Sequence, residues 1–526
     1  MEYIVSKKEM QQADRSTQEV YGIGWEVLME RAALCVTETL KNEYAAAGGK
    51  GLPRVLVFVG GGGNGGDGIA AARILHTMGA AVLLVTVGDV SSYGEKAVKQ
   101  LDIAMKYDVP FIRMQEPADA EAVRMVTGAR FDYIVDALFG VGLSRPLSGV
   151  YSAAVALMMQ LRENGAHAPR ILSIDLPSGL DTDTGEILGM AVRADLTLTM
   201  GFRKRGITLY PGASCAGEIR VADVGITEES FLGELPVLAA FDEDPRQLLP
   251  ARDPAGHKGS FGKLLIAAGN GHTGGAAILC ARAAFAAGAG MVRVFTEKKN
   301  RTAILSAVPE AIVDCWDEEM PEDRIGELLR EGLKWATACV AGPGLGTDRH
   351  AVRILTEILS DGRLPLVLDA DACNMIALDP QLKELAVGYR GEACWPVLTP
   401  HIAEFARLAG IGASEAARHT EEKTQDLAQE LFCTVLCKGA RSYTAQAGMR
   451  TVILNLTGNA GMGTAGSGDV LAGIIGAFAA AGMEAMDAAA AGSYIHGLAG
   501  DGAAAKKGQY AMTASDLIDG LGEILR

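Results

Sequence analysis

Short apolar runs recur along the first half of the chain, and segments such as residues 67–78 lie between them with helical spacing. Unbroken apolar runs are typical of strands buried on both faces of a parallel sheet. Their alternation with helices predicts an α/β structure in which helices cover both faces. The predicted strands are residues 55–59, 82–87, 133–136, 171–175 and 196–200.

The first 47 residues favour helix. Apolar side chains recur there at roughly helical spacing, with Glu and Lys between them, as on an amphipathic helix. This stripe consists of Val27, Leu28, Ala32, Leu34 and Cys35.

A second alternation of strands and helices occupies the second half. Between the halves lies an acidic segment with several prolines, a composition that favours a linker. We therefore predict domains at residues 1–225 and 257–526, joined by a linker at residues 226–256. Strands are expected at residues 263–268, 291–295, 338–341, 366–368, 396–398 and 434–437, and long Ala-rich helices after Gly468 and Met483.

Composition narrows the class of protein. Among 526 residues, 49% are hydrophobic and 21% charged, the balance of a soluble globular protein. A net charge of -16 argues against nucleic acid or an anionic membrane as partner. The nine cysteines lack zinc-site spacing, so we expect free thiols in a cytoplasmic protein. The N-terminus lacks the apolar core of a signal peptide, and no membrane span is predicted.

A glycine-rich segment, GGGGNGGDG at residues 60–68, follows the first predicted strand. Its backbone N–H groups suit a phosphate, and its glycines satisfy the dinucleotide pattern with Asp89 downstream for a ribose. Asp67 opposes that interpretation, because a carboxylate in the first helical turn would compete with pyrophosphate. A tight turn without a ligand stays an alternative.

Polar residues also end two later strands, in DALFGVG from Asp136 and in SIDLPSGLD, which holds Asp175 and Ser178. The carboxyl ends of parallel strands converge on one crevice, so these groups are expected to meet Asn64 and Asp67 there. Such oxygen ligands suit a hard cation. A helix cap is the simpler role for any one Asp, but three clusters at successive strand ends favour a site.

These motifs, preceded by LMERAA at residues 28–33, resemble the N-terminal domain of NAD(P)H-hydrate epimerases over residues 1–225. The resemblance implies a Rossmann-like α/β/α sandwich with potassium bound at Asn64, Asp136 and Ser178. We predict that Asp175 moves protons at the epimerised carbon, with Asp67 as the alternative. The hydrated NADH or NADPH is expected at Gly63, Asn64, Gly65, Gly66, Asp67, Gly140, Val141, Gly142, Leu143, Ser144, Arg145, Pro146 and Asp175.

Two positions depart from the family pattern. The family usually has two Asn before Gly-Gly-Asp, and here Gly63 stands in place of the first. Arg31 and Ala33 stand where the family usually has Asn and Gly. Gly63 still offers a backbone N–H, although the lost side chain could lower the rate. A catalytically inactive binding or sensor module is therefore a second hypothesis for this half.

The second half contains NAGMGTAGSGD at residues 459–469, directly before an Ala-rich helix. Glycines before a helix form an anion hole from backbone N–H groups and the helix dipole. Asp469 fits a base that takes a proton from a hydroxyl attacking phosphorus. Lys438, at the end of a predicted strand, could contact a nucleotide.

The GSGD sequence with its upstream Lys-Gly resembles the ribokinase-like superfamily, which implies an α/β/α fold. With HKGSFG, AGPGLG, LDADACN and LTPH, the segment from His257 onward resembles ADP- or ATP-dependent NAD(P)H-hydrate dehydratases. Ala460, Gly463 and Ala465 depart from that motif but keep their N–H groups. The resemblance implies nucleotide contacts at Lys438, Gly439, Ala440, Arg441, Ser442 and Gly468, and hydrated-cofactor contacts at Ala276, Gly344, His401 and Asp469.

Together the halves predict a repair enzyme. One half would epimerise the R and S forms of hydrated NADH and NADPH, and the other would dehydrate the S form using ADP or ATP with magnesium. The alternative is a ribokinase-like small-molecule kinase fused to a non-catalytic nucleotide-binding domain, which would release a stable phosphoester. We also expect a homo-oligomer, with the Ala-rich helices as a candidate interface.

Overall fold

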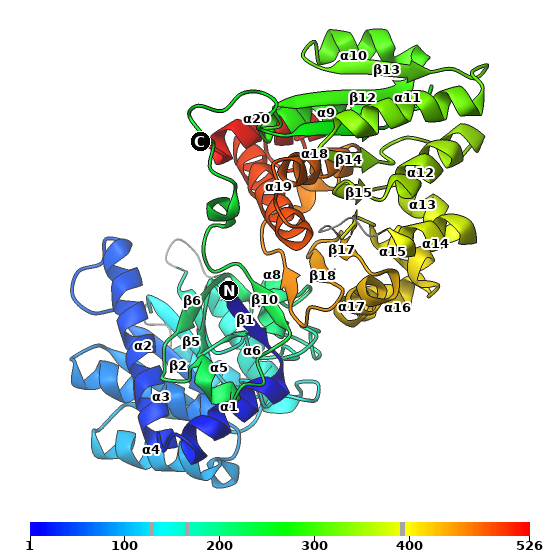
Figure 1. The fold of residues 1–526 in the computed structure, drawn as a ribbon. Helices are drawn as coiled ribbons and strands as arrows, with labels where there is room; N and C mark the ends of the chain where they lie inside the picture. The colour runs from blue at the N-terminus through cyan, green and yellow to red at the C-terminus, as the bar shows by residue number, and fades with distance from the viewer. Residues whose placement is uncertain (127–130, 164–167, 390–394) are drawn as a thin grey trace. The chain divides into compact units, whose positions relative to one another are not determined.

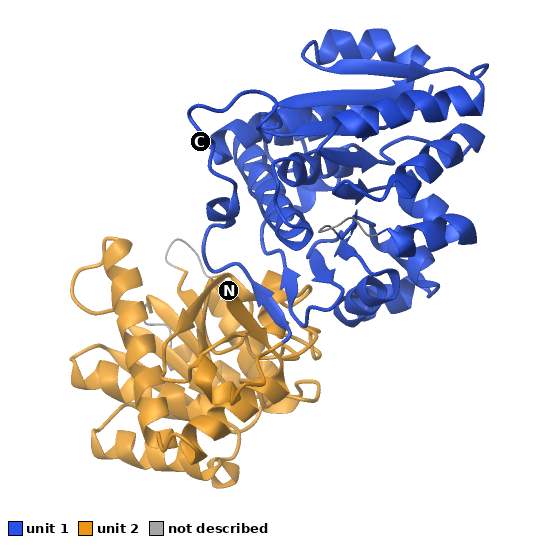
Figure 2. Ribbon diagram, viewed as in Figure 1, with its two compact units in different colours: residues 1, 237–526 blue, residues 2–236 orange. Residues whose placement is uncertain are grey.

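The computed structural model describes residues 1–126, 131–163, 168–389 and 395–526. The chain divides into an N-terminal unit, Glu2–Pro236, and a C-terminal unit, Val237–Arg526 together with Met1 (Figure 2). The boundary falls inside the predicted linker. That segment contributes short regular elements, η3 (Glu228–Phe231), β10 (Leu238–Ala240) and η4 (Pro245–Leu248).

The N-terminal unit is built on a seven-stranded sheet with every neighbouring pair parallel. The strand order is β4-β3-β2-β5-β6-β7-β9. This order reverses between β2 and β5, as in doubly wound nucleotide-binding sheets, where ligands bind outside the strand ends at the reversal. The strands are β2 (Val55–Val59), β3 (Val82–Val87), β4 (Phe111–Met114), β5 (Tyr133–Ala137), β6 (Arg170–Ile174), β7 (Leu196–Met200) and β9 (Glu218–Ala222).

Helices cover both faces of this sheet (Figure 1). Alternate residues of a strand point to opposite faces. Val57 accordingly packs in a core with α1 to α4, while Phe58 packs with α5 and α6. A second strand pair joins β1 (Glu2–Val5) to β8 (Arg203–Lys204). The helices are α1 (Lys7–Glu19), α2 (Trp25–Ala46), α3 (Gly63–Thr77), α4 (Glu95–Lys106), α5 (Asp119–Val126), α6 (Gly149–Arg162), α7 (Arg205–Thr208) and α8 (Ala213–Ala216), with η1 (Val90–Ser92).

Two details differ from the sequence-based expectation. The first 47 residues begin with strand β1, because its apolar residues Ile4 and Val5 pair with β8. Val27 and Leu34 are about half exposed, at 52% and 51%, so the buried face of α2 is centred elsewhere. That buried face consists of Leu28, Met29, Ala32, Ala33, Val36, Thr37 and Leu40.

The C-terminal unit has a mixed sheet in the order β13-β12-β11-β14-β15-β16-β17-β18-β19-β10. Strands from β13 to β17 pair in parallel, whereas β18 is antiparallel to both of its neighbours. The α/β character predicted for this half is confirmed. The strands are β11 (Lys263–Ala267), β12 (Met291–Glu297), β13 (Ile312–Trp316), β14 (Ala338–Ala341), β15 (Leu366–Leu368), β16 (Val397–Leu398), β17 (Thr434–Cys437), β18 (Tyr443–Gln446) and β19 (Val452–Leu454).

On one face of this sheet, α9, α18, α19 and α20 share a core with inward residues such as Ile266 and Val340. Nearly all of α18 and much of α19 is buried there, so these helices leave little surface for the expected subunit interface. The helices are α9 (Gly274–Ala286), α10 (Arg301–Ala307), α11 (Glu322–Trp335), α12 (Arg349–Asp361), α13 (Asp371–Leu378), α14 (Pro380–Gly388), α15 (Ile402–Ala409), α16 (Ala413–Arg418), α17 (Thr420–Leu431), α18 (Ser467–Ala480), α19 (Ala485–Lys507) and α20 (Ala514–Ile524), with η5 (Lys298–Asn300) and η6 (Ala460–Met462).

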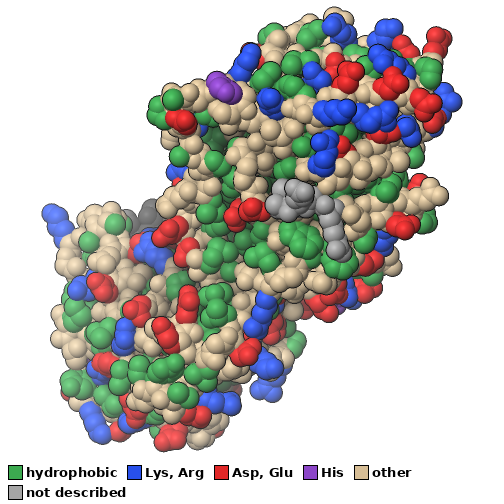
Figure 3. Space-filling view, viewed as in Figure 1, with side chains coloured by type: hydrophobic (Ala, Val, Ile, Leu, Met, Phe, Trp, Pro, Cys, Tyr) green, Lys and Arg blue, Asp and Glu red, His purple; other side chains and the backbone are tan. Residues whose placement is uncertain are grey.

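Acidic and basic side chains are interspersed on the face drawn in Figure 3. With a net charge of -16, binding of an anionic ligand therefore depends on local groups such as helix N-termini. Among the helices that the structure describes, none combines the length and apolar character needed to cross a membrane.

Candidate active sites

The glycine-rich segment of the N-terminal unit is helical from Gly63 onward, four residues earlier than predicted. Glycine is a poor helix former, but here close packing requires it. A Cβ on Gly65 would lie 1.8 Å from the carbonyl oxygen of Gly60, and one on Gly68 would lie 2.5 Å from Cβ of Ala137. Asp67 therefore lies in the second turn of the helix. It does not lie beside the first N–H groups, so the predicted competition with pyrophosphate for those groups does not apply.

Asp136, in β5, is fully buried, and its hydrogen bonds come from neutral donors. Its carboxylate accepts from Ser178 N at 2.8 Å, Ser178 Oγ at 2.6 Å and Ser173 Oγ at 2.9 Å. Burial raises the pKa of Asp136, and these bonds oppose the rise. Phe139 N donates to Ser178 Oγ at 3.0 Å, so Ser178 joins the ends of β5 and β6. The sequence prediction that Asp136 and Ser178 meet is confirmed.

Asn64 lies in the first turn of α3, next to the end of strand β2, which pairs with β5. Both polar atoms of its side chain are buried without a hydrogen-bond partner in the described structure. Gly140 lies against it, since a Cβ there would be 3.3 Å from Cβ of Asn64 and 3.2 Å from Oδ2 of Asp175. Unpartnered buried amide atoms cost about 1–3 kcal/mol, so this pair of atoms is a candidate contact for a ligand.

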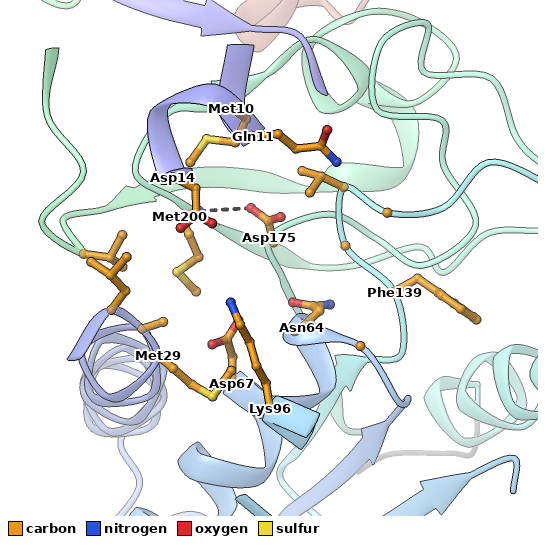
Figure 4. A pocket seen from close by; sticks show the side chains of 18 of the residues that line it. Met10, Gln11, Asp14, Met29, Asn64, Asp67, Lys96, Phe139, Asp175 and Met200 are labelled. Carbon is orange, nitrogen blue, oxygen red and sulfur yellow. Dashed lines mark hydrogen bonds between the residues drawn. The ribbon is translucent and has the colours of Figure 1, made fainter. Parts of the chain in front are cut away.

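Asp175 follows β6 and forms an ion pair that the sequence did not predict. Its Oδ1 lies 2.5 Å from Nζ of Lys204, whose side chain is 1% exposed. Met200 N also donates to this oxygen at 3.2 Å (Figure 4). Burial lowers the pKa of Lys204, and Asp175 opposes that effect. Asp175 has φ 68°, in the left-handed region where a residue other than glycine is strained, a condition common at functional sites.

Asn64, Asp175 and Lys204 line a cavity of about 360 Å³ at the reversal of the strand order, whereas Asp136 and Ser178 are not part of its lining. In Figure 4 the side chains of Asp67 and Lys96 both extend into this cavity, which both residues line. Burial raises the pKa of Asp67 well above its ordinary value, and the nearby Asp175 adds to the rise. Burial also raises the pKa of Asp14, which α1 contributes to the lining. The cavity therefore holds several carboxyl groups in different electrostatic settings, an arrangement suited to proton transfer.

Some of the predicted substrate residues line the cavity, and others pack against neighbouring residues or lie farther along the loop. Those in the lining are Gly63, Asn64, Asp67, Gly140, Val141, Gly142, Leu143 and Asp175. Gly65 and Gly66 pack against Gly60 and Met29, and Ser144, Arg145 and Pro146 follow the lining residues in the same loop. Arg31 lies 3.2 Å from the carboxylate of Asp223.

In the C-terminal unit, the predicted phosphate site lies at the start of α18. Gly466 precedes the helix with φ 89°, and no side chain caps this end in the described structure. The first N–H groups of the helix therefore remain available to an anion. We call residues 458–468, which include the first two residues of this helix, the anion loop.

A buried ion pair lies beneath the first turn of α18. Lys438 Nζ is 2.6 Å from Oδ1 of Asp369, which also accepts from Thr399 Oγ1 at 2.8 Å. Burial lowers the pKa of Lys438, but Asp369 outweighs it and the net shift is upward. A Cβ on Gly468 would lie 3.2 Å from Lys438 Nζ, so a side chain at this position would require the lysine to shift slightly.

Asp469 is next to this pair. Burial raises the pKa of Asp469 to about 7, with Asp369 adding to the rise and Lys438 opposing it. A carboxylate with a pKa near neutrality is matched to accepting a proton at physiological pH. The electrostatic setting of Asp469 therefore favours the base predicted at this position.

The remaining predicted residues form two groups. Gly344 lies against Ala276, since a Cβ on Gly344 would be 3.0 Å from Cβ of Ala276. His401 forms a β-bridge with Lys438, and its half-exposed ring accepts from Ala403 N at the start of α15. The nucleotide segment Lys438, Gly439, Ala440, Arg441 and Ser442 is the turn between β17 and β18, in which Gly439 N donates to Ser442 Oγ at 3.3 Å.

Comparisons with known proteins cover both units. A family model described as NAD(P)H-hydrate dehydratase matches residues 264–522, and one described as YjeF-related protein N-terminus matches residues 25–206. A bifunctional NAD(P)H-hydrate repair enzyme of Moorella thermoacetica is 35% identical over 100% of this chain and 97% of its own length. Its counterpart in Escherichia coli is 31% identical over 98% of this chain and 93% of its own.

The chain belongs to the bifunctional NAD(P)H-hydrate repair enzymes. The resemblance predicted from the motifs of both halves is thereby confirmed. A ribokinase-like superfamily protein of Enterococcus faecalis is 27% identical, covers 55% of this chain and 95% of its own, and has a TM-score of 0.48. An ADP/ATP-dependent NAD(P)H-hydrate dehydratase of Bacillus subtilis, co-crystallised with ATP/Mg2+, is 24% identical over 54% of this chain and 97% of its own, with a TM-score of 0.45.

Several residues at the two sites of this repair enzyme escaped prediction. Lys204, Asp14 and Lys96 lie in segments without a motif, and only folding brings them to the cavity. Asp369 does lie in one of the motifs, LDADACN, and its position at a strand end was a usable signal. Ala370, between Asp369 and Asp371, has φ 49°, so strained backbone directs these two carboxylates.

Proposed function

We propose that the N-terminal unit interconverts the R and S forms of hydrated NADH and NADPH. We further propose that the C-terminal unit dehydrates the S form at the expense of ADP or ATP. The observation that carries this proposal is Asp469, a carboxyl group with a pKa near 7 at the entrance of an uncapped helix that follows a glycine-rich loop. The corresponding domains would be residues 1–225 and 257–526.

The dehydration follows from the placement of Asp469. Its carboxylate takes the proton of the ring hydroxyl, whose oxygen attacks the terminal phosphorus and releases AMP from ADP, or ADP from ATP. The first N–H groups of α18 stabilise the transferring phosphoryl group. The electrons of the ring nitrogen then expel phosphate, and loss of a ring proton yields the dihydronicotinamide. We propose that magnesium arrives with the nucleotide phosphates.

Hydrated-cofactor contacts at Ala276, Gly344, His401 and Asp469 are part of this proposal. Nucleotide contacts at Gly468 and along the turn from Lys438 to Ser442 are equally part of it. Gly439 and Ala440 are exposed in that turn, so their backbone is accessible. Lys438 itself is paired with Asp369, so it would meet a nucleotide as one partner of an ion pair.

For the epimerase, we propose that Asp175 exchanges protons with the hydroxyl at the inverted carbon. Inversion requires one bond at that carbon to break and to re-form on the opposite face, with the proton leaving and returning. Lys204 holds Asp175 toward the cavity at 2.5 Å, and Asp67, whose pKa is raised, could supply a proton. The missing Asn at position 63 leaves this pair intact.

We propose that potassium binds at Asn64, Asp136 and Ser178, as the resemblance implies. The side-chain oxygen of Asn64 is buried without a partner in the described structure, and the carboxylate of Asp136 is buried among hydroxyl and backbone N–H donors. A bound potassium ion would supply positive charge that offsets the carboxylate and would fix the loop after β5. Epimerisation that proceeds equally well in sodium or lithium buffer, with potassium removed, would contradict this assignment.

One experiment tests the whole proposal. The full chain is incubated with mixed hydrate epimers and either ADP or ATP, while the dihydronicotinamide absorbance is followed. Recovery of absorbance is the expected result, and the two parallel reactions identify the phosphate donor. A stable phosphoester without recovered absorbance would favour the small-molecule kinase, and no reaction with either nucleotide would defeat the proposal.

We also propose a cytoplasmic location, where free cysteines persist. We further propose that the protein is a homo-oligomer, which gel filtration tests.

A further inference from the structure

The segment that leads from β19 to α18 runs along one side of helix α19 (Figure 1). Two carbonyl oxygens in the middle of the helix accept side-chain hydrogen bonds from this segment. Asn455 Nδ2 donates to Ser493 O at 3.2 Å, and Thr457 Oγ1 donates to Tyr494 O at 2.8 Å. The anion loop therefore begins at a point fixed to α19.

Glycines in α19 let the loop approach closely. A Cβ on Gly497 would lie 2.1 Å from Thr457 Oγ1, and one on Gly500 would lie 2.3 Å from Sδ of Met462. Glycine inside a helix costs about 1 kcal/mol relative to alanine. Two such positions facing one loop indicate that the helix surface is shaped to receive it.

Asp501, one helical turn beyond Gly497, binds the start of the anion loop with both carboxylate oxygens. Oδ2 accepts from Gly458 N at 2.9 Å, and Oδ1 accepts from Asn459 Nδ2 at 3.0 Å. The amide oxygen of Asn459 in turn accepts from Gly461 N at 3.0 Å. These bonds fix the orientation of successive peptide groups in the loop.

His496 contacts the other end of the anion loop. Its Nε2 lies 3.3 Å from Oγ of Ser467, the first residue of α18. Burial lowers the pKa of His496 to about 4, with Lys438 adding to the effect, so the ring is neutral at physiological pH. A neutral ring beside the loop adds no charge that would distort the anion site.

We propose that Asp501 and Asn459 are positioning residues for the dehydratase, which hold the anion loop in the geometry that phosphoryl transfer needs. The inference rests on the proposed dehydratase function and adds residues outside the predicted site. Transition-state stabilisation depends on N–H groups that are already in place. A loosened loop should therefore lower kcat while nucleotide KM stays close to the wild-type value.

The pair allows a reciprocal test. Asp501→Asn places an amide donor against either Gly458 N–H or the Asn459 amide, so one bond is lost. Asn459→Asp places two carboxylates face to face. The double variant, which combines Asn459→Asp with Asp501→Asn, can restore every bond. Its new amide at position 501 would donate to the new carboxylate at position 459 and still accept from Gly458 N. We expect each single variant to lower dehydratase kcat about 10- to 100-fold, and the double variant to recover most of it.

Epimerisation by the same full-length molecules provides the internal control, because its site lies in the other unit. Thermal unfolding of each variant separates lost positioning from lost folding. Single variants with wild-type kcat, or a kcat loss that the double variant does not reverse, would overturn the inference. Wild-type protein that shows no dehydration at all would instead defeat the proposed function, so the two failures are distinguishable.

Discussion

At the scale of single residues, Asp469 shows how burial and an existing ion pair together set reactivity. Lys438 is already neutralised by Asp369 at 2.6 Å, so it offers Asp469 less stabilisation than a free lysine would. Burial then dominates, and it raises the pKa of Asp469 to about 7. The same carboxyl group in water would be a weaker base by about three pKa units.

Two consequences of this assignment can be measured. Asp469→Asn should lower dehydratase turnover by about 10²–10⁴-fold, because a positioned base contributes that much, while nucleotide binding is largely retained. In the wild type, kcat should fall by about tenfold per pH unit below pH 7, since protonated Asp469 cannot accept a proton. Calorimetry with the nucleotide and a pH–rate profile test these points. Near-normal turnover in the variant would rule out the role.

Gly140 allows a second prediction at this scale. A methyl group there would lie 3.2 Å from Oδ2 of Asp175 and 3.3 Å from Cβ of Asn64, closer than these neighbours accommodate without moving. Gly140→Ala should therefore reduce epimerase kcat/KM by about tenfold or more by displacing both groups. Epimer interconversion measured by chromatography tests it, with dehydration by the same sample as control. Unchanged epimerisation would show that neither group needs its present position.

At the scale of elements, α19 makes opposite predictions for two of its glycines. A Cβ on Gly497 would meet Thr457 Oγ1 at 2.1 Å, whereas one on Gly502 would meet nothing within 4 Å. Gly502→Ala should stabilise the protein by about 0.5–1 kcal/mol, because alanine is the better helix former. Gly497→Ala should instead destabilise it, because the clash outweighs that gain. Denaturant unfolding compares the two, and equal effects would contradict the packing argument.

Elements made of unbroken apolar runs were predictable, and elements set by packing were not. Strands β2 and β3 were predicted at their observed bounds, and both long Ala-rich helices were predicted close to where they begin, since burial on both faces leaves a clear apolar pattern. The start of α3 was placed four residues late. Its glycines favour a turn by propensity, but the space beside Gly60 and Ala137 makes them helical. Edge strand β4 was missed because two of its four residues are exposed.

The residues of the candidate sites likewise fall into those that the sequence could predict and those that depend on packing. Parallel strands bring their carboxyl ends together, so the meeting of Asp136 with Ser178 could be predicted from topology alone. Lys204 could not, because its role depends on the side chain folding back to Asp175 and burying a charge. The hydrogen bonds from the anion loop to Asp501 could not be predicted either, since Asp501 and Asn459 are 42 positions apart in the sequence.

At the scale of the whole molecule, each unit has its own sheet, hydrophobic core and site. Substitutions at distant sites without shared partners act independently. A change in one site should therefore alter one activity and spare the other. The two proposed reactions share a metabolite, however. Loss of epimerisation should therefore still limit the fraction of hydrated cofactor that the dehydratase converts.

This coupling gives a prediction for the complete reaction. With mixed R and S hydrates and a suitable nucleotide, the wild type should recover the absorbance of the entire mixture, because epimerisation feeds the R form to the dehydratase. Asp175→Asn should show the same fast phase but stop near the fraction that was S at the start, followed only by slow spontaneous epimerisation. The fast phase itself shows that the C-terminal unit is folded and active. Complete recovery at the wild-type rate would mean that Asp175 is dispensable, and a lost fast phase would mean that the two sites are not independent.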